Sequence, residues 1–370
     1  FLAYTVVLGM GYTWQVALLA VFVEGLIFIV LSLTNVREAI FNAIPLTLKR
    51  GVSVGIGLFI CFIGLQNAGL AVDSSTLVTI TSFTENFNTH GICALLALVG
   101  LFIMAALYIH HVRGAILLGI LATWIIGMIC QVVGIYVPDP ANGFYTLFPT
   151  MALTDFSKLG MTFGQCFNVD FSAVGIVNFI VVIFSFLFVD IFDTLGTLIG
   201  VATKAKMLDK DGKLPGIKPA LLADSIATSA GAILGTSTTT TFVESASGVA
   251  VGGRTGLTAL VTGILFLVST LFAPIFTAIP SFATAPALIM VGFLMVGTVT
   301  EINFDLDNLT ESIPAYLAII AMPLFYSISE GISLGVISYV LLNVAAGKGK
   351  KVAPLMYVLA VLFVLKYIFL

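Results

Sequence analysis

Charged residues are scarce in this chain of 370 residues. Asp, Glu, Lys and Arg together make up only 9% of it, whereas soluble domains carry about 25%. This scarcity excludes an ordinary soluble domain, and a formal net charge of −3 gives no basis for binding nucleic acid. Because 59% of the residues are hydrophobic and the mean hydropathy is +1.16, the composition predicts a polytopic protein embedded in a lipid bilayer.

Cysteine and histidine are also rare, with four and three residues respectively. The cysteines are far apart and lack the spacing of metal ligands, and the histidines do not form a ligand set. The chain also offers no nucleophile–base pair and no cofactor motif. We therefore expect a protein that is not an enzyme, without a metal or cofactor, in which the cysteines are small apolar side chains.

Long apolar runs are what the sequence has in abundance, and runs of about 20 residues predict membrane-spanning helices. Several of these runs are short or broken by Pro and Gly, as occurs where helices pack or break inside a bundle. A partial run opens the chain at Phe1–Met10, and the others lie at 13–34, 44–72, 91–110, 114–136, 174–203, 219–234, 242–252, 256–279, 286–302, 313–327, 330–347 and 353–370.

Basic residues gather in alternate loops between these runs. Arg37, Lys49 and Arg50 share one loop, and five lysines crowd the segment 204–218. Loops rich in Lys and Arg stay on the cytoplasmic side, so these loops are predicted to be cytoplasmic. The long loop 137–172 has a single base and is expected on the opposite side of the membrane.

The sequence repeats itself weakly. EGLIFIVL at 24–31 resembles TGILFLVS at 262–269, and AIP follows each of them. An odd number of runs separates the two copies, which gives them opposite orientations, as in many secondary transporters with a midplane site. By this comparison roughly 65 residues of the first copy would precede Phe1, so we expect a truncated first repeat that is inactive by itself.

The stretch 235–253, GTSTTTTFVESASGVAVGG, breaks the helical pattern. Its β-branched run favours extended backbone, which a membrane tolerates only where it is buried in protein or lines a cavity. Glu244 follows the threonines, at the start of a helix predicted near Phe242, where free N–H groups could bind a polar substrate. The plainer alternative is that Glu244 and the Thr hydroxyls merely cap that helix.

Two further acids, Asp190 and Asp193, are three residues apart and share one helix face. Ionisable groups inside spans are costly and usually mark function. Thr194 and Gly196 follow Asp193 and could line a pocket with it, whereas Asp190 has apolar neighbours and is expected to support it. The alternative is a pair that only packs against a neighbouring helix.

The remaining intramembrane charges are assigned lesser roles. Asp224 is interpreted as structural or as a supporting partner of the site. Glu24 is left uncertain, Glu330 is expected at the membrane interface, and Arg254 is expected to cap the C-terminal end of the broken helix.

Three motifs carry a resemblance to a known family: FVDIFDTLGTLIG, LLADSIATSAGAILGTSTTTTFVESASGVAVGGRTGLTA and AMPLFYSISEGISLG. They resemble the nucleobase–cation symporter-2 family, and within it the azaguanine-type (AzgA-like) permeases for adenine, guanine and hypoxanthine. The resemblance implies two inverted repeats of seven spans, core and gate domains, and a short strand in each of two broken helices. On this match the chain would begin inside the third span and hold about 12 of 14 spans.

The resemblance also implies a domain division. The C-terminal tail lies beyond the fourteen spans of the family. It could cross the membrane or lie on its surface, and of these two an interfacial helix is preferred. The expected parts are core segments 1–33 and 173–279, gate segments 44–136 and 286–347, the extracytoplasmic loop 137–172 and the apolar tail 348–370.

By the same resemblance, Asp193 and Glu244 are expected to bind the N–H edge of a purine and to couple it to a proton. Stacking by an aromatic ring is expected, from Phe242 or Phe192. The other substrate-binding residues are Thr240, Thr241, Phe242 and Ser245, and the supporting residues are Asp190, Thr194, Gly196 and Asp224.

The sequence therefore predicts a secondary active transporter that takes up purine nucleobases with protons across a bacterial-type plasma (inner) membrane, by alternating access. The family analogy suggests homodimers formed through the gate. The alternative is an anion transporter or channel of the same inverted-repeat fold, although two carboxylates in the cavity would repel anions. The sequence leaves open which purine is preferred.

Overall fold

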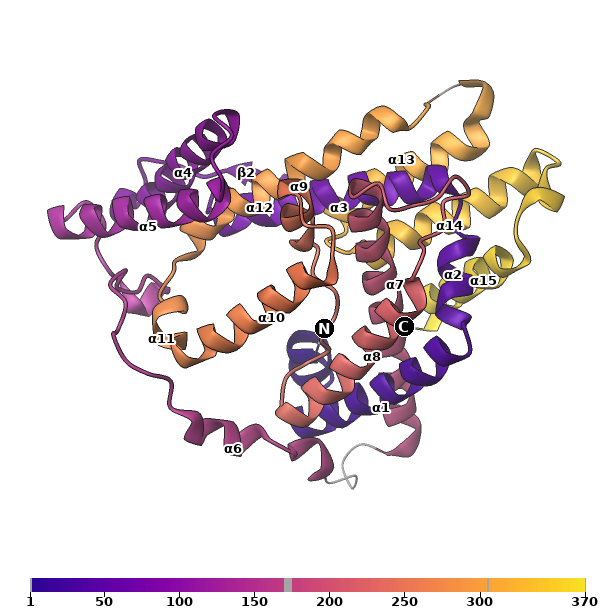
Figure 1. Cartoon of the computed structure of the whole chain (residues 1–370), viewed down its shortest axis with the longest axis horizontal. Coiled ribbons are helices and arrows are strands. Elements are labelled where there is room, and N and C mark those ends of the chain that lie inside the picture. The colour runs from indigo at the N-terminus through magenta and orange to yellow at the C-terminus, as the bar shows by residue number, and fades with distance from the viewer. Residues whose placement is uncertain (1, 170–174, 305, 370) are drawn as a thin grey trace. The chain divides into compact units, whose positions relative to one another are not determined.

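The computed structural model describes residues 2–169, 175–304 and 306–369, and most of them are helical (Figure 1). The expected boundary at 172–173 lies outside these residues. The principal helices are α1 (Trp14–Leu33), α2 (Val36–Ala43), α3 (Leu46–Asn67), α4 (Ile92–Ile109), α5 (Ala115–Val133), α6 (Leu159–Thr162), α7 (Ile176–Lys204), α8 (Ile217–Leu234), α9 (Ser245–Val251), α10 (Gly256–Leu271), α11 (Ala273–Phe276), α12 (Ser281–Val296), α13 (Leu309–Leu324), α14 (Ile328–Ala345) and α15 (Pro354–Phe369). Short π or 3₁₀ segments lie at Leu2–Gly9, Phe87–Gly91, Pro140–Asn142, Phe156–Lys158, Gln165–Phe167, Gly297–Glu301, Leu306–Asn308 and Gly349–Lys351.

The helices follow the apolar runs closely, which confirms the all-α polytopic fold class. The predicted run 13–34 forms α1, and the run 219–234 forms α8 with two more residues at its start. Eight helices among the described residues are long and apolar enough to cross a membrane, and three shorter apolar helices accompany them. Apolar run length therefore determined where these helices lie.

The chain packs into two compact units, which we describe separately. The first unit comprises Phe1–Ile56, Asp155–Val243 and Thr298–Leu370, and the second comprises Gly57–Thr154 and Glu244–Gly297. The division runs through α3. Each unit therefore draws on both halves of the sequence.

In the first unit, α1 lies side by side with α8 (Figure 1). The close approach depends on Gly25, because a Cβ atom there would lie 2.8 Å from the backbone nitrogen of Ser229. Small residues let helices in membranes approach closely, which compensates for the missing hydrophobic drive between apolar surfaces. The same helix pair carries most of the buried polar groups described below.

The C-terminal helix α15 packs against other helices of the first unit. Its residues Met356, Leu359 and Phe363 are buried, and α15 contacts α14 and α2. Lys366 forms an ion pair with Glu330 of α14. Glu330, in the first turn of α14, is thus held by a partner within the first unit.

An aromatic cluster joins α15 to α7. The ring of Phe363 lies 4.5 Å from that of Phe192 and 5.2 Å from that of Phe188, measured between centroids. Both Phe363 and Phe192 are buried. Phe192 is therefore committed to this cluster, which argues against its expected role in stacking on a substrate.

Substitution of Phe363 by alanine is expected to destabilise the first unit by about 3–5 kcal/mol, because it removes a fully buried ring and leaves a cavity. Thermal denaturation of the detergent-purified protein measures this effect. Leu362, whose side chain is 45% exposed, provides the control, and Leu362→Ala should change stability by less than about 0.5 kcal/mol. Equal stability of the two variants would contradict the packing of α15 against α7.

In the second unit, α4 and α5 pack against each other and against α12. Their shared apolar core includes Cys93, Leu96, Trp124 and Phe282. By contrast, none of the residues of α10 is buried, although the helix is mostly apolar and the hydroxyls of Thr262, Ser269 and Thr270 bond to carbonyls of the helix itself. A helix that is apolar on every side suits contact with lipid or with further protein.

The two strands found among the described residues are not where a strand was predicted. They are β1 (Ala71–Ser74) and β2 (Leu77–Ile80), which pair as an antiparallel hairpin after α3. The predicted strand within 235–253 is wrong for the described residues, since the chain between Gly235 and Glu244 is irregular and joins no sheet. The β-branched run prevents helix formation there, but a strand also needs a partner for its backbone groups.

Candidate functional site

The candidate site is built around residues 236–243, which we call the Thr segment. Helix α8 is capped at its C-terminal end by Gly235, whose φ angle of +92° is one that residues with a side chain rarely adopt. The N–H of the next residue, Thr236, donates to the Gly231 carbonyl at 2.9 Å. The segment then runs irregularly to the start of α9. Thr228 of α8 fastens it by donating its hydroxyl to the Thr239 carbonyl at 2.9 Å.

Asp224 of α8 holds the end of the Thr segment. Its carboxylate accepts the backbone N–H of Thr241 at 3.1 Å and the Thr241 hydroxyl at 3.3 Å. The hydroxyl of Thr194 on α7 donates to the same carboxylate at 3.3 Å. This buried side chain therefore joins α7, α8 and the Thr segment, which agrees with its expected supporting position.

Arg37 of α2 is the counter-ion of Asp224. Its guanidinium donates to Asp224 at 3.0 Å, to the Ser225 hydroxyl at 2.9 Å and to the Leu221 carbonyl at 3.2 Å. The Arg37 side chain is fully buried and its guanidinium carbon lies 4.3 Å from the centre of the Phe28 ring. The sequence placed Arg37 in a loop between two apolar runs, whereas the structure places it in the short helix α2 and buries it.

The other hydroxyls and acids of the cluster complete a buried polar centre in the first unit. Thr194 and Thr240 share a hydroxyl–hydroxyl hydrogen bond of 2.7 Å, which ties α7 to the Thr segment. Thr238 donates to Glu24 of α1 at 3.3 Å. Glu24 and Asp190 are both buried, and each has one carboxyl oxygen without a hydrogen-bond partner among the described residues.

Five of the predicted site residues thus come together in one hydrogen-bonded cluster: Asp190, Thr194, Asp224, Thr240 and Thr241. Asp193 lies on the same helix directly before Thr194 and is half-buried. Gly196 has a different environment from the one expected, because it packs against Ile328 and Ile332 of α14. Phe242 is 59% exposed at the end of the Thr segment.

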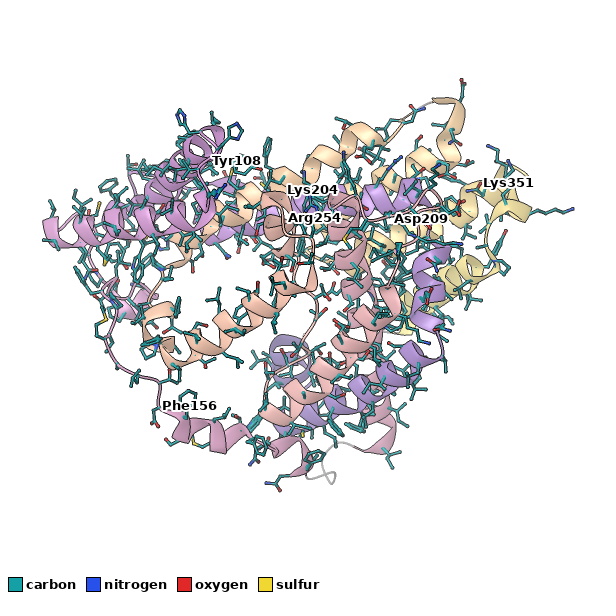
Figure 2. All side chains as sticks on the ribbon, viewed as in Figure 1. Tyr108, Phe156, Lys204, Asp209, Arg254 and Lys351 are labelled. Atoms are coloured by element: carbon teal, nitrogen blue, oxygen red, sulfur yellow. The ribbon has the colours of Figure 1, made fainter. Side chains whose placement is uncertain are left out.

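Glu244 and Ser245 belong to the second unit, where Glu244 occupies the N-cap position of α9 and both residues are exposed. The helix begins within a few residues of the predicted start. At its other end, Arg254 donates to the carbonyls of Val249 and Gly253, at 2.6 and 2.8 Å, in the turn before α10 (Figure 2). The expected capping role of Arg254 is confirmed.

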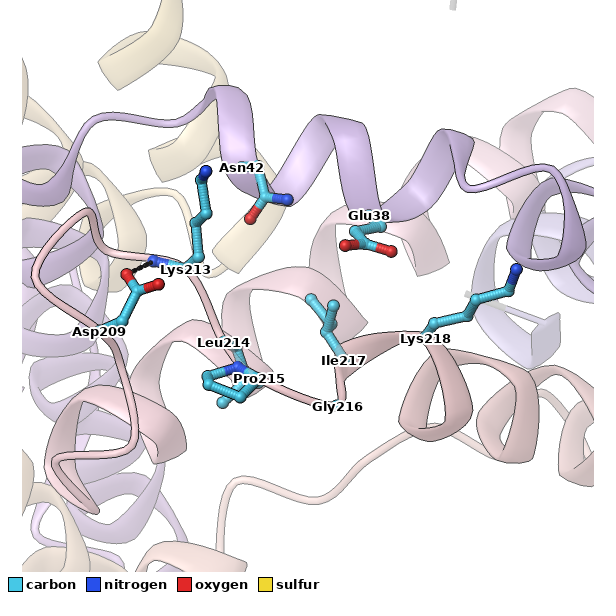
Figure 3. Close-up of a pocket in the computed structure, with 9 residues that line it drawn as sticks. All are labelled: Glu38, Asn42, Asp209, Lys213, Leu214, Pro215, Gly216, Ile217 and Lys218. Carbon is cyan, nitrogen blue, oxygen red and sulfur yellow. Dashed lines mark hydrogen bonds between the residues drawn. The ribbon is translucent and has the colours of Figure 1, made fainter.

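A separate hollow of about 270 Å³ opens in the first unit between α2 and the loop that leads into α8 (Figure 3). Glu38 and Asn42 line it from α2, and Asp209 and Lys213 line it from the loop. Its charges balance, and Asp209 is already bound to the backbone N–H of Lys213 at 2.8 Å. The hollow is therefore the space between α2 and this loop, and it is a poor candidate for substrate binding.

Sequence reasoning missed Arg37 and gave Glu24 little weight. Arg37 stands in TNVREAI, where the polar residues Thr34 and Asn35 and the charge of Glu38 resemble a loop. The signal for Glu24 was present, since it is the only acid in an otherwise apolar run of the sequence at 13–34. The rule that a charge inside a span marks function would have selected it.

Comparison with known proteins also indicates a membrane transport protein. A family model described as a permease family matches residues 1–334. The chain is 46% identical to the guanine/hypoxanthine permease PbuG of Bacillus subtilis, over 97% of this chain and 76% of that protein. It is 44% identical to the guanine/hypoxanthine permease PbuO of Bacillus subtilis, over 95% and 77%, and 39% identical to the adenine permease AdeQ of Escherichia coli, over 100% and 78%.

The fold and its buried polar centre define a membrane transport protein, and the matches extend over nearly the whole chain. The chain belongs to this permease family, as the motif resemblance predicted. It is accordingly a multi-pass protein of the plasma membrane, and the family consists of transporters and not of enzymes.

Proposed function

We propose that this permease takes up purine nucleobases across the plasma membrane in symport with protons. Relatives at 39–46% identity carry the names guanine/hypoxanthine permease and adenine permease, and they match this chain almost from end to end. The observation that carries the proposal is the buried polar centre around the Thr segment. A purine offers several hydrogen-bond donors and acceptors on a planar ring, and binding it requires such groups inside the membrane.

The proposed substrate site combines two carboxyls with the end of the Thr segment. Asp193 and Glu244 are proposed to accept the N–H edge of the purine and to link its binding to a proton. Thr240, Thr241 and Ser245 would supply hydroxyl and amide groups, and the exposed ring of Phe242 would stack on the base. The cluster of Asp190, Thr194 and Asp224 would hold this end of the segment in place.

Transport is proposed to proceed by alternating access, with the expected core segments 1–33 and 173–279 shifting against the gate segments 44–136 and 286–347. The irregular Thr segment, placed between α8 and α9, is suited to such a movement because it is not locked into a helix or a sheet. Dimers formed through the gate remain part of the proposal.

An anion transporter of the same fold is the competing function. The described polar centre of the first unit opposes it, because Glu24, Asp190 and Asp224 outnumber the single cation Arg37. A buried excess of carboxyl groups favours neutral bases with N–H donors over anions.

The proposed function is tested by uptake in cells that lack their own purine permeases and that express this protein. Radiolabelled adenine, guanine or hypoxanthine is expected to accumulate, and a protonophore should abolish the accumulation. Unlabelled purines should compete, whereas uracil should compete at least about 100-fold less well, because it leaves buried polar groups unpaired. Transport of sulfate or nitrate and of no base would refute the proposal.

A further inference from the structure

The polar centre of the first unit contains a carboxyl that no other part of the mechanism uses. Glu24 has 0% of its surface exposed and lies in the middle of α1, a helix that is long and apolar enough to cross the membrane. One of its oxygens accepts the Thr238 hydroxyl at 3.3 Å, and the other has no hydrogen-bond partner among the described residues. A buried carboxylate with an unpaired oxygen is costly, whereas a protonated carboxyl is much less so.

The charges around Glu24 leave it without a counter-ion of its own. The charged groups that act on it are Asp190 of α7, Asp224 of α8 and Arg37 of α2. The only cation among these, Arg37, is already paired with Asp224 at 3.0 Å. Three carboxyls against one guanidinium in a low-dielectric interior favour holding protons on the two carboxyls that lack a salt bridge.

Of these two carboxyls, Glu24 has the direct route to the Thr segment. Among the described residues, the one side-chain hydrogen bond of Asp190 is with the Thr194 hydroxyl, at a long 3.5 Å, whereas Glu24 is hydrogen-bonded to the Thr segment itself through Thr238. Glu24 contacts the Thr segment at Thr238, and Asp224 holds the other end of the segment at Thr241. A change in the charge of Glu24 therefore acts on the segment that Asp224 also holds.

We propose that Glu24 is a further proton-storing carboxyl of the symport, beside Asp193 and Glu244, which face the substrate and link its binding to a proton. This inference rests on the proposed function, since it assigns the proton of the symport. Glu24 takes up one proton on its carboxylate and later releases it to water on the other side of the membrane, and only its O–H bond forms and breaks.

The geometry also supplies a way for the proton to act at a distance. The Nε–H of Arg37 has no hydrogen-bond partner among the described residues, so the guanidinium has a donor to spare. When Glu24 loses its proton, the new carboxylate competes with Asp224 for Arg37. Asp224 then loses the salt bridge that fixes the orientation of its carboxylate, and the Thr segment that it holds through Thr241 is free to rearrange.

The test separates coupling from transport. Purified protein is reconstituted in liposomes, and two assays use the purine that the wild type transports: accumulation driven by an imposed pH gradient, and exchange of labelled for unlabelled base at equal pH. Glu24→Gln should exchange within about twofold of the wild-type rate, because the amide still accepts from Thr238. It should lose accumulation, so that the base reaches only equal concentrations inside and outside.

Two control variants show whether a loss of accumulation is specific to the carboxyl of Glu24. Glu38→Gln makes the same change at a half-buried residue of α2 and should keep both activities, and Glu24→Asp should recover accumulation. Accumulation by Glu24→Gln at the wild-type level, or its loss of exchange as well, would overturn the assignment. A wild type that neither exchanges nor accumulates any purine would instead refute the proposed function.

A spectroscopic measurement keeps the assignment testable if Glu24→Gln does not fold. The infrared difference spectrum of the wild type between acidic and alkaline buffer should contain the C=O stretch of a protonated carboxyl. This band should move in Glu24→Asp. An unchanged band in that variant would show that the proton resides elsewhere.

Discussion

Substitution of Arg37 by alanine is expected to destabilise the first unit by about 3–5 kcal/mol, because it leaves the buried carboxylate of Asp224 without its counter-ion. Both side chains are almost completely buried, at 0% and 2% exposure. The loss should appear as a lower denaturation temperature in detergent and as reduced yield of monodisperse protein.

Two comparisons isolate the ion pair as the cause. The double variant Arg37→Ala, Asp224→Asn should recover a large part of the loss, since the neutral amide needs no counter-ion and still offers one oxygen to Thr241. Arg113→Ala removes the same side chain from an exposed position and should change stability by less than about 0.5 kcal/mol. Wild-type stability of Arg37→Ala would show that the pair contributes nothing.

Substitution of Glu244 by glutamine is expected to reduce proton-coupled purine uptake to background, at least about 100-fold, while the protein still reaches the membrane. The amide preserves the shape of the side chain but cannot carry a charge or exchange a proton. It also presents an NH₂ group that would oppose the N–H edge of the purine. Uptake of labelled base in permease-deficient cells, normalised to the protein in the membrane, measures the effect.

Glu85→Gln is the matched control, because Glu85 is likewise an exposed glutamate of the second unit, in the loop before α4. It should transport like the wild type. Normal uptake by Glu244→Gln would remove Glu244 from the mechanism and would leave the helix-capping alternative for this residue.

Local features of the sequence were sufficient for much of the fold. Helix α8 was predicted to within two residues of its start because an apolar run and a following Gly mark both of its ends. The capping of α9 by Arg254 was likewise predictable, since the groups involved are only a few residues apart. Such features depend on neighbours along the chain, and these are visible in the sequence.

The Thr segment shows where local reasoning becomes insufficient. The threonines correctly indicated a break in the helix, but the predicted strand requires a partner strand, and no strand pairs with these residues in the described structure. What holds the segment is the set of side chains Glu24, Thr194 and Asp224, which come from three different helices. Composition at 236–243 cannot identify them.

The sequence by itself determined that this chain is a helical membrane permease, because apolar run length and local motifs are properties of short segments. Only the tertiary structure decided which charges are paired. Arg37 and Asp224 are separated by 187 residues in the chain and by 3.0 Å in the fold. In a low-dielectric interior that separation decides whether a charge is tolerated, and it is the reason why Glu24, which has no such partner, is the carboxyl that we propose to hold a proton.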